Sequence, residues 1–451
     1  MIENITYDKL KEYFKNSKDV NINEFYRDNH YFICMYVENQ ANIMEFNANY
    51  ITKINANNIN SLTSIFPGIF NRITNVNYST IEESVFNGKI LLLIDNEIYY
   101  EIILIKKTIR TPSKSNLDPT NLFGATDGFV EDARTNLSLI RKRLKTTNLV
   151  VEEVYIGDQN KTLLYVMHLK EFDKYKEEII KKIKTSPLKF PTSISAISKI
   201  FQGNSLMPMT AITGYPENFS TALTQGKTGI ILDNSPVGLI LPATLSSFSN
   251  MKNDENSPAF YSVFIRIFII FFLILSVFGL GFMIGLINYH PDCLTISLVS
   301  NLKLTERGTN FTIFIEVVSI LILFEFYRFA ASRSSPSYIQ NIVVILGSLF
   351  IGQNAINSGL IGPLILLITS MAYLSSYAFT NNPYMISALS NFRFFILVLS
   401  HLFGLFGFFI ASFVVIAYLS SLKSFDIPYL YPLTPVSKSG IKEFFIPRSK
   451  R

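Results

Sequence analysis

The chain has 451 residues, of which 49% are hydrophobic and 16% are charged, and its formal net charge is +6. This length leaves room for two or three domains, and the two cysteines are too few for a disulfide framework. The basic surplus lies in residues 260–451, which hold 12 Lys and Arg against 6 Asp and Glu. Residues 1–259 therefore carry equal numbers of basic and acidic side chains. This balance argues against a nucleic-acid-binding protein.

A first α/β subdomain is predicted for residues 1–110. Runs rich in apolar and β-branched residues at 32–46 and 89–105 indicate strands, and the second run turns at Asp95 between two β-rich halves, which is typical of a hairpin. A stretch rich in Pro, Ser and Asn follows at 111–121, and this composition indicates a linker.

A second α/β subdomain is predicted for residues 122–250. Apolar residues at helical spacing predict a helix over 131–145, and an amphipathic pattern predicts another over 171–184. Two β-rich runs that flank turn residues predict hairpins over 150–169 and 228–241.

The densest charge cluster of this part is the basic run at 134–143. Such a run can bind a phosphate, an acidic partner or lipid headgroups. It is also typical of a solvated helix face, or of local ion pairs, here with Asp127, Glu131 and Asp132. We favour this second interpretation.

The composition changes after a polar tether at 251–266. Residues 267–422 are predicted to hold the membrane-associated helices, and the first segment, 267–287, has 21 residues without a charge. At about 1.5 Å rise per residue, a helix of this length crosses the hydrocarbon core of a bilayer. Further apolar segments follow at 311–329, 339–356, 360–379 and 394–422.

The two ends of the chain set the expected orientation. The first residues are polar, so no signal peptide is expected and the α/β module stays in the cytosol. The tail, residues 423–451, is basic, and basic flanks favour the cytoplasmic side. Ends on one side require an even number of crossings. One of the five apolar segments is therefore expected to be interfacial or re-entrant, and we select 311–329 because it is charged.

That segment contains Glu316, Glu325 and Arg328. Charges at membrane depth are typical of an ion path or a subunit contact. Glu325 and Arg328 are three positions apart, so they can pair on one helix face. The alternative is an amphipathic helix at the headgroup boundary with its charges in water. The sequence leaves both interpretations open.

Small and amide-bearing residues gather between positions 347 and 362. A helix with one small, polar and uncharged stripe can hydrate and can pack against copies of itself, as a pore lining must. The alternative is an ordinary helix–helix interface with a hydrogen-bonded end. The residues that we select as pore-lining or subunit-packing are Gly347, Ser348, Gly352, Gln353, Asn354, Ala355, Asn357 and Gly359.

No catalytic pattern stands out in the sequence. It contains neither a nucleophile elbow of the GxSxG type nor a Walker-type phosphate loop. The four histidines and two cysteines are scattered without the spacing of metal ligands. We therefore expect no enzyme, no cofactor and no metal site.

Six motifs follow one another along the chain: 127–143, 226–242, Tyr289-His290-Pro291, the set Glu325, Arg328 and Ala330, 351–359, and 422–435. The first contains Gly128, Phe129, Glu131, Asn136, Arg141 and Arg143. In this order they resemble the A subunit of bacterial spore germinant receptors, the GerA family. The chain departs from the family pattern where relatives carry arginines before the first motif, since Phe123, Gly124, Ala125 and Thr126 stand there.

The resemblance implies a multi-pass protein of the spore inner membrane with cytoplasmic N- and C-termini. It also implies a homo-oligomer, a pentamer, that contacts membrane lipids and works with a transporter-like B subunit and a lipoprotein C subunit. Family members of this kind are expected to conduct monovalent cations when a nutrient binds the receptor.

We therefore expect a multidomain membrane protein, with an N-terminal α/β cytosolic module of two subdomains and a C-terminal α-helical transmembrane bundle. Its expected function is that of a germinant-receptor A subunit, which forms a ligand-gated cation channel that triggers spore germination. The alternatives are a secondary transporter or permease, which predicts repeats and broken helices, and a non-conducting membrane scaffold or amplifying paralogue of the receptor.

Overall fold

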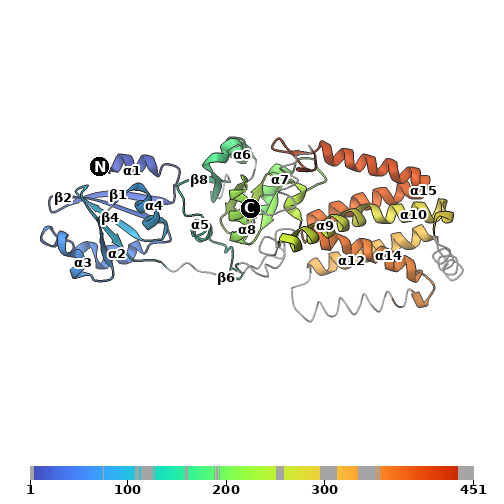
Figure 1. Ribbon diagram of the computed structural model, residues 1–451, viewed down its shortest axis with the longest axis horizontal. Coiled ribbons are helices and arrows are strands. Elements are labelled where there is room, and N and C mark those ends of the chain that lie inside the picture. Colours follow the sequence, from blue (N-terminus) through green and yellow to red (C-terminus); the bar gives the residue numbers. More distant parts are fainter. Residues whose placement is uncertain are drawn as a thin grey trace. The chain divides into compact units, whose positions relative to one another are not determined.

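The computed structural model of the chain describes residues 5–74, 76–106, 111–112, 125, 127–157, 161–186, 188, 191, 193–249, 259–294, 312–333, 353 and 356–434. The chain divides into two compact units (Figure 1). The α/β unit comprises Met1–Ser205 and Met209–Ala243, and the helical unit comprises Leu206–Pro208 and Thr244–Arg451. The helical unit thus starts slightly before the boundary at 250 that the sequence suggested.

The first subdomain of the α/β unit is built on an antiparallel sheet with the strand order β1-β2-β4-β5-β3. The strands are β1 (Val20–Arg27), β2 (His30–Val37), β3 (Phe70–Ile73), β4 (Ile90–Ile94) and β5 (Ile98–Ile102). The helices are α1 (Tyr7–Tyr13), α2 (Ile43–Asn49), α3 (Leu62–Ile65) and α4 (Tyr78–Phe86), with the 3-10 turns η1 (Ile51–Lys53) and η2 (Ala56–Ser61).

The middle of this sheet is buried on both faces. Leu92 and Ile94 of β4 pack into one apolar cluster, and Leu91 and Leu93 pack into the other. Because side chains alternate between the faces of a strand, a strand covered on both sides is apolar at every position. This explains the uninterrupted apolar run of β4.

The hairpin expected over 89–105 is present as β4 and β5, and Asp95 and Asn96 at its turn have φ angles of 51° and 58°. The strand expected over 32–46 was wrong in its second half, because β2 ends at Val37 and α2 follows. The side chain of Asn42 accepts a hydrogen bond from the N–H of Glu45 at the start of α2. Such a cap stabilises the first turn of a helix.

The expected linker begins with a strand. Thr111–Pro112 form β6, which pairs antiparallel with β7 (Asp127–Gly128). Residues 113–121 of that linker lie outside the described residues. Thr111 and Pro112 are therefore paired with the start of the second subdomain.

The second subdomain has a sheet with the order β10-β12-β11-β9-β8. Its strands are β8 (Leu149–Ile156), β9 (Thr162–Leu169), β10 (Ala211–Thr213), β11 (Thr228–Leu232) and β12 (Gly238–Leu241). Its helices are α5 (Ala133–Arg141), α6 (Lys176–Thr185), α7 (Ile194–Gln202) and α8 (Pro216–Thr224), and the 3-10 segment η3 (Lys170–Tyr175) precedes α6. Both expected hairpins are thus present, as β8–β9 and β11–β12.

Two glycines let α8 lie close to its sheet. A Cβ atom at Gly229 of β11 would come within 2.1 Å of the Phe219 ring of α8, and one at Gly238 of β12 within 2.8 Å. Any larger residue at either position would push the helix away.

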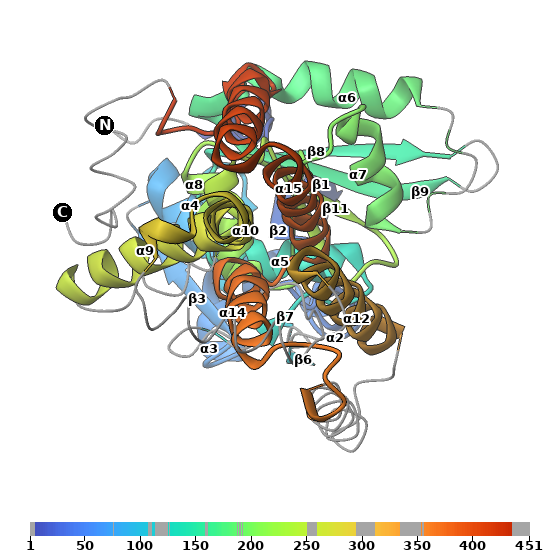
Figure 2. The same cartoon turned by 90° about the vertical axis from the view of Figure 1, so that its right-hand side faces the viewer.

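The helical unit contains α9 (Ala259–Ile274), the π-helical segment η6 (Leu275–Gly279), α10 (Leu280–Tyr289), α12 (Ile313–Arg333), α14 (Pro363–Phe379) and α15 (Pro383–Ser421), together with the turns η4 (Leu245–Phe248) and η7 (Pro291–Cys293). Figure 2 shows α10, α12 and α14 viewed close to their axes. A buried apolar cluster joins them, and its members include Ile284 of α10, Val317 of α12, Ile365 of α14 and Leu397 of α15.

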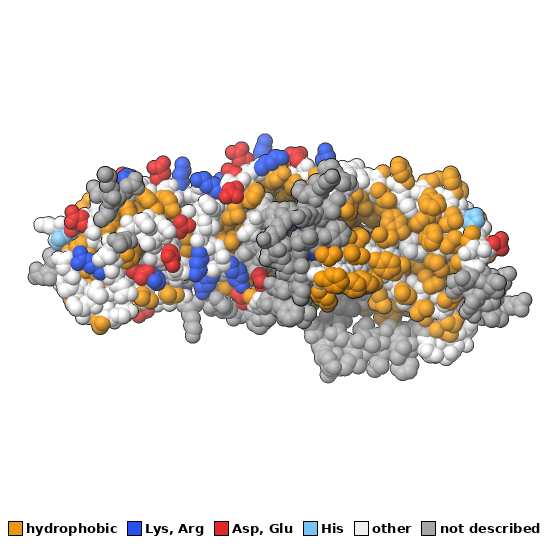
Figure 3. Space-filling model, in the orientation of Figure 1, with side chains coloured by type: hydrophobic (Ala, Val, Ile, Leu, Met, Phe, Trp, Pro, Cys, Tyr) orange, Lys and Arg blue, Asp and Glu red, His pale blue; other side chains and the backbone are white. Residues whose placement is uncertain are grey.

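Two helices are long and apolar enough, by length and composition, to cross a membrane. Val263–Tyr289 has a mean hydropathy of 2.9 and Pro383–Ser421 one of 2.4. Large apolar side chains are exposed along both, and Figure 3 shows such side chains gathered over the helical unit. Exposed apolar side chains along whole helices are typical of contact with lipid or with another protein.

α15 is not one straight helix. Gly404 has φ 63° and ψ −145°, a backbone conformation open essentially to glycine. The rings of Phe392 and Tyr418 lie 5.8 Å apart, whereas a straight helix would separate these positions by about 39 Å. α15 is therefore a helical hairpin with two arms that meet at Gly404, and the single long segment expected at 394–422 was wrong.

The tail expected over 423–451 begins as a packed turn. Strands β13 (Lys423–Ser424) and β14 (Ile427–Pro428) form a short antiparallel pair. Tyr429 beside them is fully buried, and its hydroxyl donates a hydrogen bond to the carbonyl of Pro208 at 3.2 Å. Residues 435–451 of the tail lie outside the described residues.

Candidate functional site in the helical unit

Polar groups from four elements meet inside the helical unit, and we call the residues that supply them the polar layer. Its members are Ser276 of η6, Glu325 of α12, Tyr373 and Ser376 of α14, and Ser390 and Arg393 of α15. Polar groups are costly in an apolar interior unless they bond one another, so a layer of this kind fixes the arrangement of its helices.

Arg393 is the centre of the polar layer and is only 1% exposed. Its Nε donates a hydrogen bond to the backbone carbonyl of Ser276 at 2.5 Å, and its Nη2 donates to Oγ of Ser376. The guanidinium carbon lies 5.5 Å from the centre of the Tyr373 ring. Within the described residues its Nη1 has no hydrogen-bond partner and Arg393 forms no ion pair. Among the described residues, the groups that hydrogen-bond or stack with this buried positive charge are thus neutral.

Glu325 holds two partners at once. Its Oε2 accepts a hydrogen bond from Nε of Arg328 at 2.7 Å, and its Oε1 accepts one from the hydroxyl of Ser390 at 2.6 Å. The ion pair predicted from the three-residue spacing is therefore formed, with side chains 33% and 28% exposed. Ser390 and Arg393 are also three positions apart, so Glu325 lies about one helical turn from the buried charge.

Glu316 does not lie in water. It is 2% exposed, and its Oε2 accepts a hydrogen bond from the backbone N–H of Gly362 at 2.9 Å. Val317 and Ile320 on the same helix belong to the buried apolar cluster. The alternative of a headgroup-level helix with all its charges in water is thus wrong for Glu316.

The residues selected as pore-lining are only partly described. Gly347, Ser348, Gly352, Asn354 and Ala355 lie outside the described residues. Gln353 and Asn357 are exposed, and Gly359 has a φ of 68° just before α14 begins. Among the described residues of this stripe, the side chains of Gln353 and Asn357 are thus open to solvent or to a second chain.

Tyr289 caps the break in α15. Its hydroxyl shares one proton between the carbonyls of His401 at 3.0 Å and Leu402 at 3.1 Å, which the turn at Gly404 leaves without their helical partners. A Cβ at Gly404 would come within 2.7 Å of the Tyr289 ring. The ring of His401 stacks on that of Phe314 at 4.0 Å.

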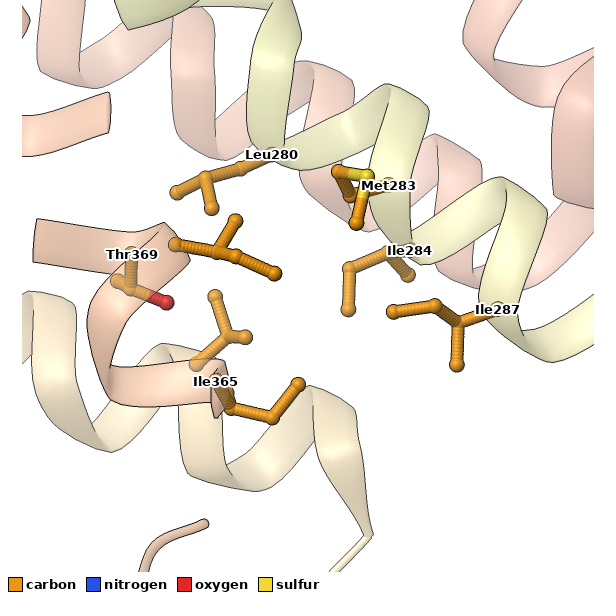
Figure 4. Close-up of a pocket in the computed structure, with 8 residues that line it drawn as sticks. Leu280, Met283, Ile284, Ile287, Ile365 and Thr369 are labelled. Atoms are coloured by element: carbon orange, nitrogen blue, oxygen red, sulfur yellow. The ribbon is translucent and has the colours of Figure 1, made fainter. Parts of the chain in front are cut away.

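A small apolar pocket lies between α10, α12 and α14 (Figure 4). Thr369 supplies a hydroxyl that is fully buried and has no hydrogen-bond partner within the described residues. The other lining residues are apolar: Leu280, Met283, Ile284, Ile287, Val317, Ile365 and Ile368.

In the α/β unit, Arg141 joins the two subdomains. Its Nε and Nη2 donate to the two carboxylate oxygens of Asp19 at 2.8 and 2.6 Å, and its Nη1 donates to the carbonyl of Thr146 at 2.7 Å. The guanidinium lies 4.5 Å from the centre of the Phe86 ring. Arg134 on the same helix makes a second, exposed pair with Glu38.

The other signature residues organise the turn before α5. Asn136 is fully buried and exchanges two hydrogen bonds with the backbone of Val130. Phe129 packs edge-on against Phe219, with ring centres 5.5 Å apart. The carbonyl of Glu131 accepts a hydrogen bond from Asn234, and Gly128 lies in β7.

The basic run thus forms specific ion pairs. Arg143 pairs with Asp127 at 2.5 Å, as the favoured interpretation expected, and Asp132 caps α5 through the N–H groups of Arg134 and Thr135. The partners of Arg134 and Arg141 come from the first subdomain, which the sequence did not indicate.

A further charge group lies on β8. Glu152 accepts from Lys18 and Lys176, each at 2.9 Å. Burial raises the pKa of this carboxyl, but the hydrogen bonds and charges of the two lysines outweigh burial and leave the pKa below its usual value. Lys18 belongs to the first subdomain, so this pair also spans the two subdomains.

Sequence reasoning missed Arg393, Asp19 and the role of Tyr289. Arg393 stands one position before the apolar segment that was predicted at 394–422. Pro383 after the capping residue Asn382 is the start signal of the helix, and a helix begun there places Arg393 within the apolar span. Asp19 carries no local signal, because its partner lies 122 positions away.

A family model described as Bacillus/Clostridium GerA spore germination protein matches residues 8–450. Spore germination protein XA of Bacillus anthracis is 30% identical over 360 residues, which cover 79% of this chain and 73% of that protein. Spore germination protein GerQA of Bacillus cereus is 27% identical over 447 residues, which cover 97% and 89%.

A solved structure also matches, described as the N-terminal domain of the A subunit of the Bacillus megaterium spore germinant receptor GerK3. It has a TM-score of 0.39 and 23% identity, over 52% of this chain and 94% of that chain. The family model and the sequence relatives confirm the family resemblance seen in the six motifs. Because the family model spans the α/β unit and the helical unit alike, this chain belongs to the GerA family of spore germination proteins.

Proposed function

We propose that this chain is the A subunit of a nutrient germinant receptor, and that copies of it form a ligand-gated channel for monovalent cations in the spore inner membrane. The observation that carries the proposal is the family match over residues 8–450. On this proposal the protein is not an enzyme and requires no cofactor.

The cation path is proposed to lie between copies of the chain. Inside one copy the helices pack on a continuous apolar cluster, and Arg393 adds a fixed positive charge. Both features oppose the passage of a cation. The proposed lining is therefore the segment 347–359, whose residues Gln353 and Asn357 are exposed.

The hairpin at Gly404 supports both termini on the cytoplasmic side. Its two arms raise the number of apolar segments from five to six, so an even number of crossings no longer requires α12 to be interfacial. The burial of Glu316 against Gly362 supports α12 as a packed member of the bundle.

The remaining partners follow from the family. A pentamer of this chain would work with a transporter-like B subunit and a lipoprotein C subunit, and the exposed apolar side chains would contact lipid or these partners. Nutrient binding to the complex would shift the equilibrium from the closed to the open form.

The test is cation release from spores that lack this chain after the addition of mixed nutrients. Loss or slowing of potassium or sodium release, restored by the wild-type chain, is the expected result. Normal release would contradict the proposal. Release that depends on the chain, with no cation flux through the reconstituted complex, would favour the non-conducting scaffold.

A secondary transporter remains the second candidate because α15 is broken at Gly404, and transporter sites are often built at broken helices. Tyr289 already occupies the carbonyls that such a site would use. Substrate-dependent uptake by the purified chain in vesicles would favour the transporter over the channel.

A further inference from the structure

We propose that the polar layer is a charge-exchange switch, in which Glu325 pairs with Arg328 in the state described here and with the buried Arg393 in a second state. The inference rests on the proposed channel function for its biological meaning. It starts from one observation: Arg393 is buried with neutral partners, while a carboxylate lies one helical turn away.

The two arginines compete for Glu325 on unequal terms. Arg328 is 28% exposed near the end of α12, from which a long side chain can extend to the membrane surface, so its pair with Glu325 contributes little stability. Arg393 is 1% exposed, and a buried charge interacts far more strongly with an opposite charge. Once released, Arg328 can extend past the end of α12 to water at the membrane surface, whereas Arg393 is held in the interior.

The spacing of residues along α15 favours the exchange. Ser390 already holds Oε1 of Glu325 at 2.6 Å, and Arg393 follows Ser390 on the same face of α15. Nη1 of Arg393 has no hydrogen-bond partner within the described residues, so it can donate a hydrogen bond to the carboxylate without breaking an existing bond. Its bonds to Ser276 and Ser376 can persist in both states.

The switch would act on the proposed pore through α12. Glu325 and Arg328 lie on α12, which precedes the segment 347–359 in the chain, and α14 follows that segment. Release of Arg328 and attraction of Glu325 to Arg393 would move α12 relative to α15. Such an element with two discrete arrangements is what a gate needs.

The first test uses spores in which the wild-type chain restores release. Arg328→Gln removes the competitor, so cation release without nutrient should rise about fivefold or more.

Glu325→Gln removes the shared carboxylate and should slow nutrient-triggered release. The double variant should behave like Glu325→Gln alone. Arg393→Met should also slow release. Ser387→Ala on the same helix is the control, with unchanged release, and immunoblots keep the comparison to variants of equal abundance.

Opposite signs for Arg328→Gln and Glu325→Gln separate a switch from a structural role. If both variants slow release, or if the gain in Arg328→Gln survives the addition of Glu325→Gln, the switch is wrong while the channel proposal stands. If deletion of the whole chain leaves release unchanged, the channel proposal fails instead.

A second measurement does not depend on channel function. Melting temperatures of the purified full chain in detergent form a double-mutant cycle between Glu325→Gln and Arg393→Met. The coupling between the two changes should be small in the wild-type chain, where Glu325 and Arg393 act on each other only through their charges, and clearly larger in the Arg328→Gln background, where Glu325 is free to bind Arg393. Equal coupling in both backgrounds would overturn the switch.

Discussion

Arg141 and Arg393 are both buried, yet their surroundings differ in charge. Arg141 meets the carboxylate of Asp19 through two hydrogen bonds, whereas Arg393 meets a carbonyl, a hydroxyl and an aromatic ring. A buried charge is tolerated when it is paired and hydrogen-bonded, so Arg141 can hold the two subdomains together in this structure. Arg393 lacks that pairing, which is why it can belong to a switch.

Arg141→Ala is expected to lower the free energy of unfolding of the α/β unit by about 3–5 kcal/mol, because it leaves Asp19 buried and unpaired. Urea unfolding of the purified full chain in detergent measures this. Arg134→Ala is the matched control on the same helix, and its exposed pair with Glu38 should contribute about 1 kcal/mol or less. Equal effects of the two variants would contradict the assignment.

His168 predicts a pH dependence of stability. It is 1% exposed on β9, and burial lowers its pKa below the usual value, aided by Lys176 and opposed by Asp173 and Glu152. Below about pH 6.5, His168 binds a proton in the unfolded chain but not in the folded chain, so the free energy of unfolding falls as the pH falls. Each unit by which the pKa of His168 in the folded chain lies below that in the unfolded chain lowers the free energy of unfolding at acidic pH by up to about 1.4 kcal/mol.

The variant His168→Gln should remove that part of the pH dependence. The difference in urea midpoint between wild type and variant should be constant above neutral pH and should change below about pH 6.5. A difference that is independent of pH would show that His168 takes up its proton in the folded state as readily as in the unfolded state.

At the scale of elements, the decisive feature is the fold of α15 at Gly404. The apolar pattern runs through the break without interruption, so composition alone indicates one span. Tyr289 from α10 bonds the carbonyls at the break, and Phe392 and Tyr418 bring the two arms together. The hairpin thus depends on contacts between helices and on a backbone conformation suited to glycine.

The double variant Phe392→Cys and Tyr418→Cys, in a chain without Cys34 and Cys293, should be joined by a short bismaleimide cross-linker, because the two rings lie 5.8 Å apart. A cysteine at Phe413, which is 74% exposed on the second arm, is the control and should not cross-link to position 392. Absence of the first cross-link would favour a straight helix.

At the scale of the whole molecule, the two units differ in composition. The α/β part is charge-balanced and packed around two sheets, whereas the helical unit carries the exposed apolar surface and the polar layer. On the proposed function, assembly of several copies completes the cation path that one copy closes with packed side chains.

Ala355→Leu tests the proposed lining in that assembly. A bulky side chain on a small, polar stripe should block nutrient-triggered cation release from spores, while the protein still accumulates in the membrane. The control is Leu367→Ala on the exposed face of α14. Unchanged release in Ala355→Leu would argue against a lining role for this segment.

The sequence predicted the elements whose signals are local. The β4–β5 hairpin follows from β-rich runs around turn residues, and the Glu325–Arg328 pair follows from a three-residue spacing. The end of β2 was missed because the cap at Asn42 outweighs the apolar pattern that continues past it.

The sequence by itself determined the division into an α/β part and an apolar helical part, and the family, because composition, periodicity and motif order are properties of neighbouring residues. Only the tertiary structure decided which groups surround the buried charges. Asp19 reaches Arg141 across 122 positions and Ser276 reaches Arg393 across 117, and the arms of α15 meet only once Gly404 has turned. Contacts at such separations are fixed by the packing of whole elements, which no local pattern encodes.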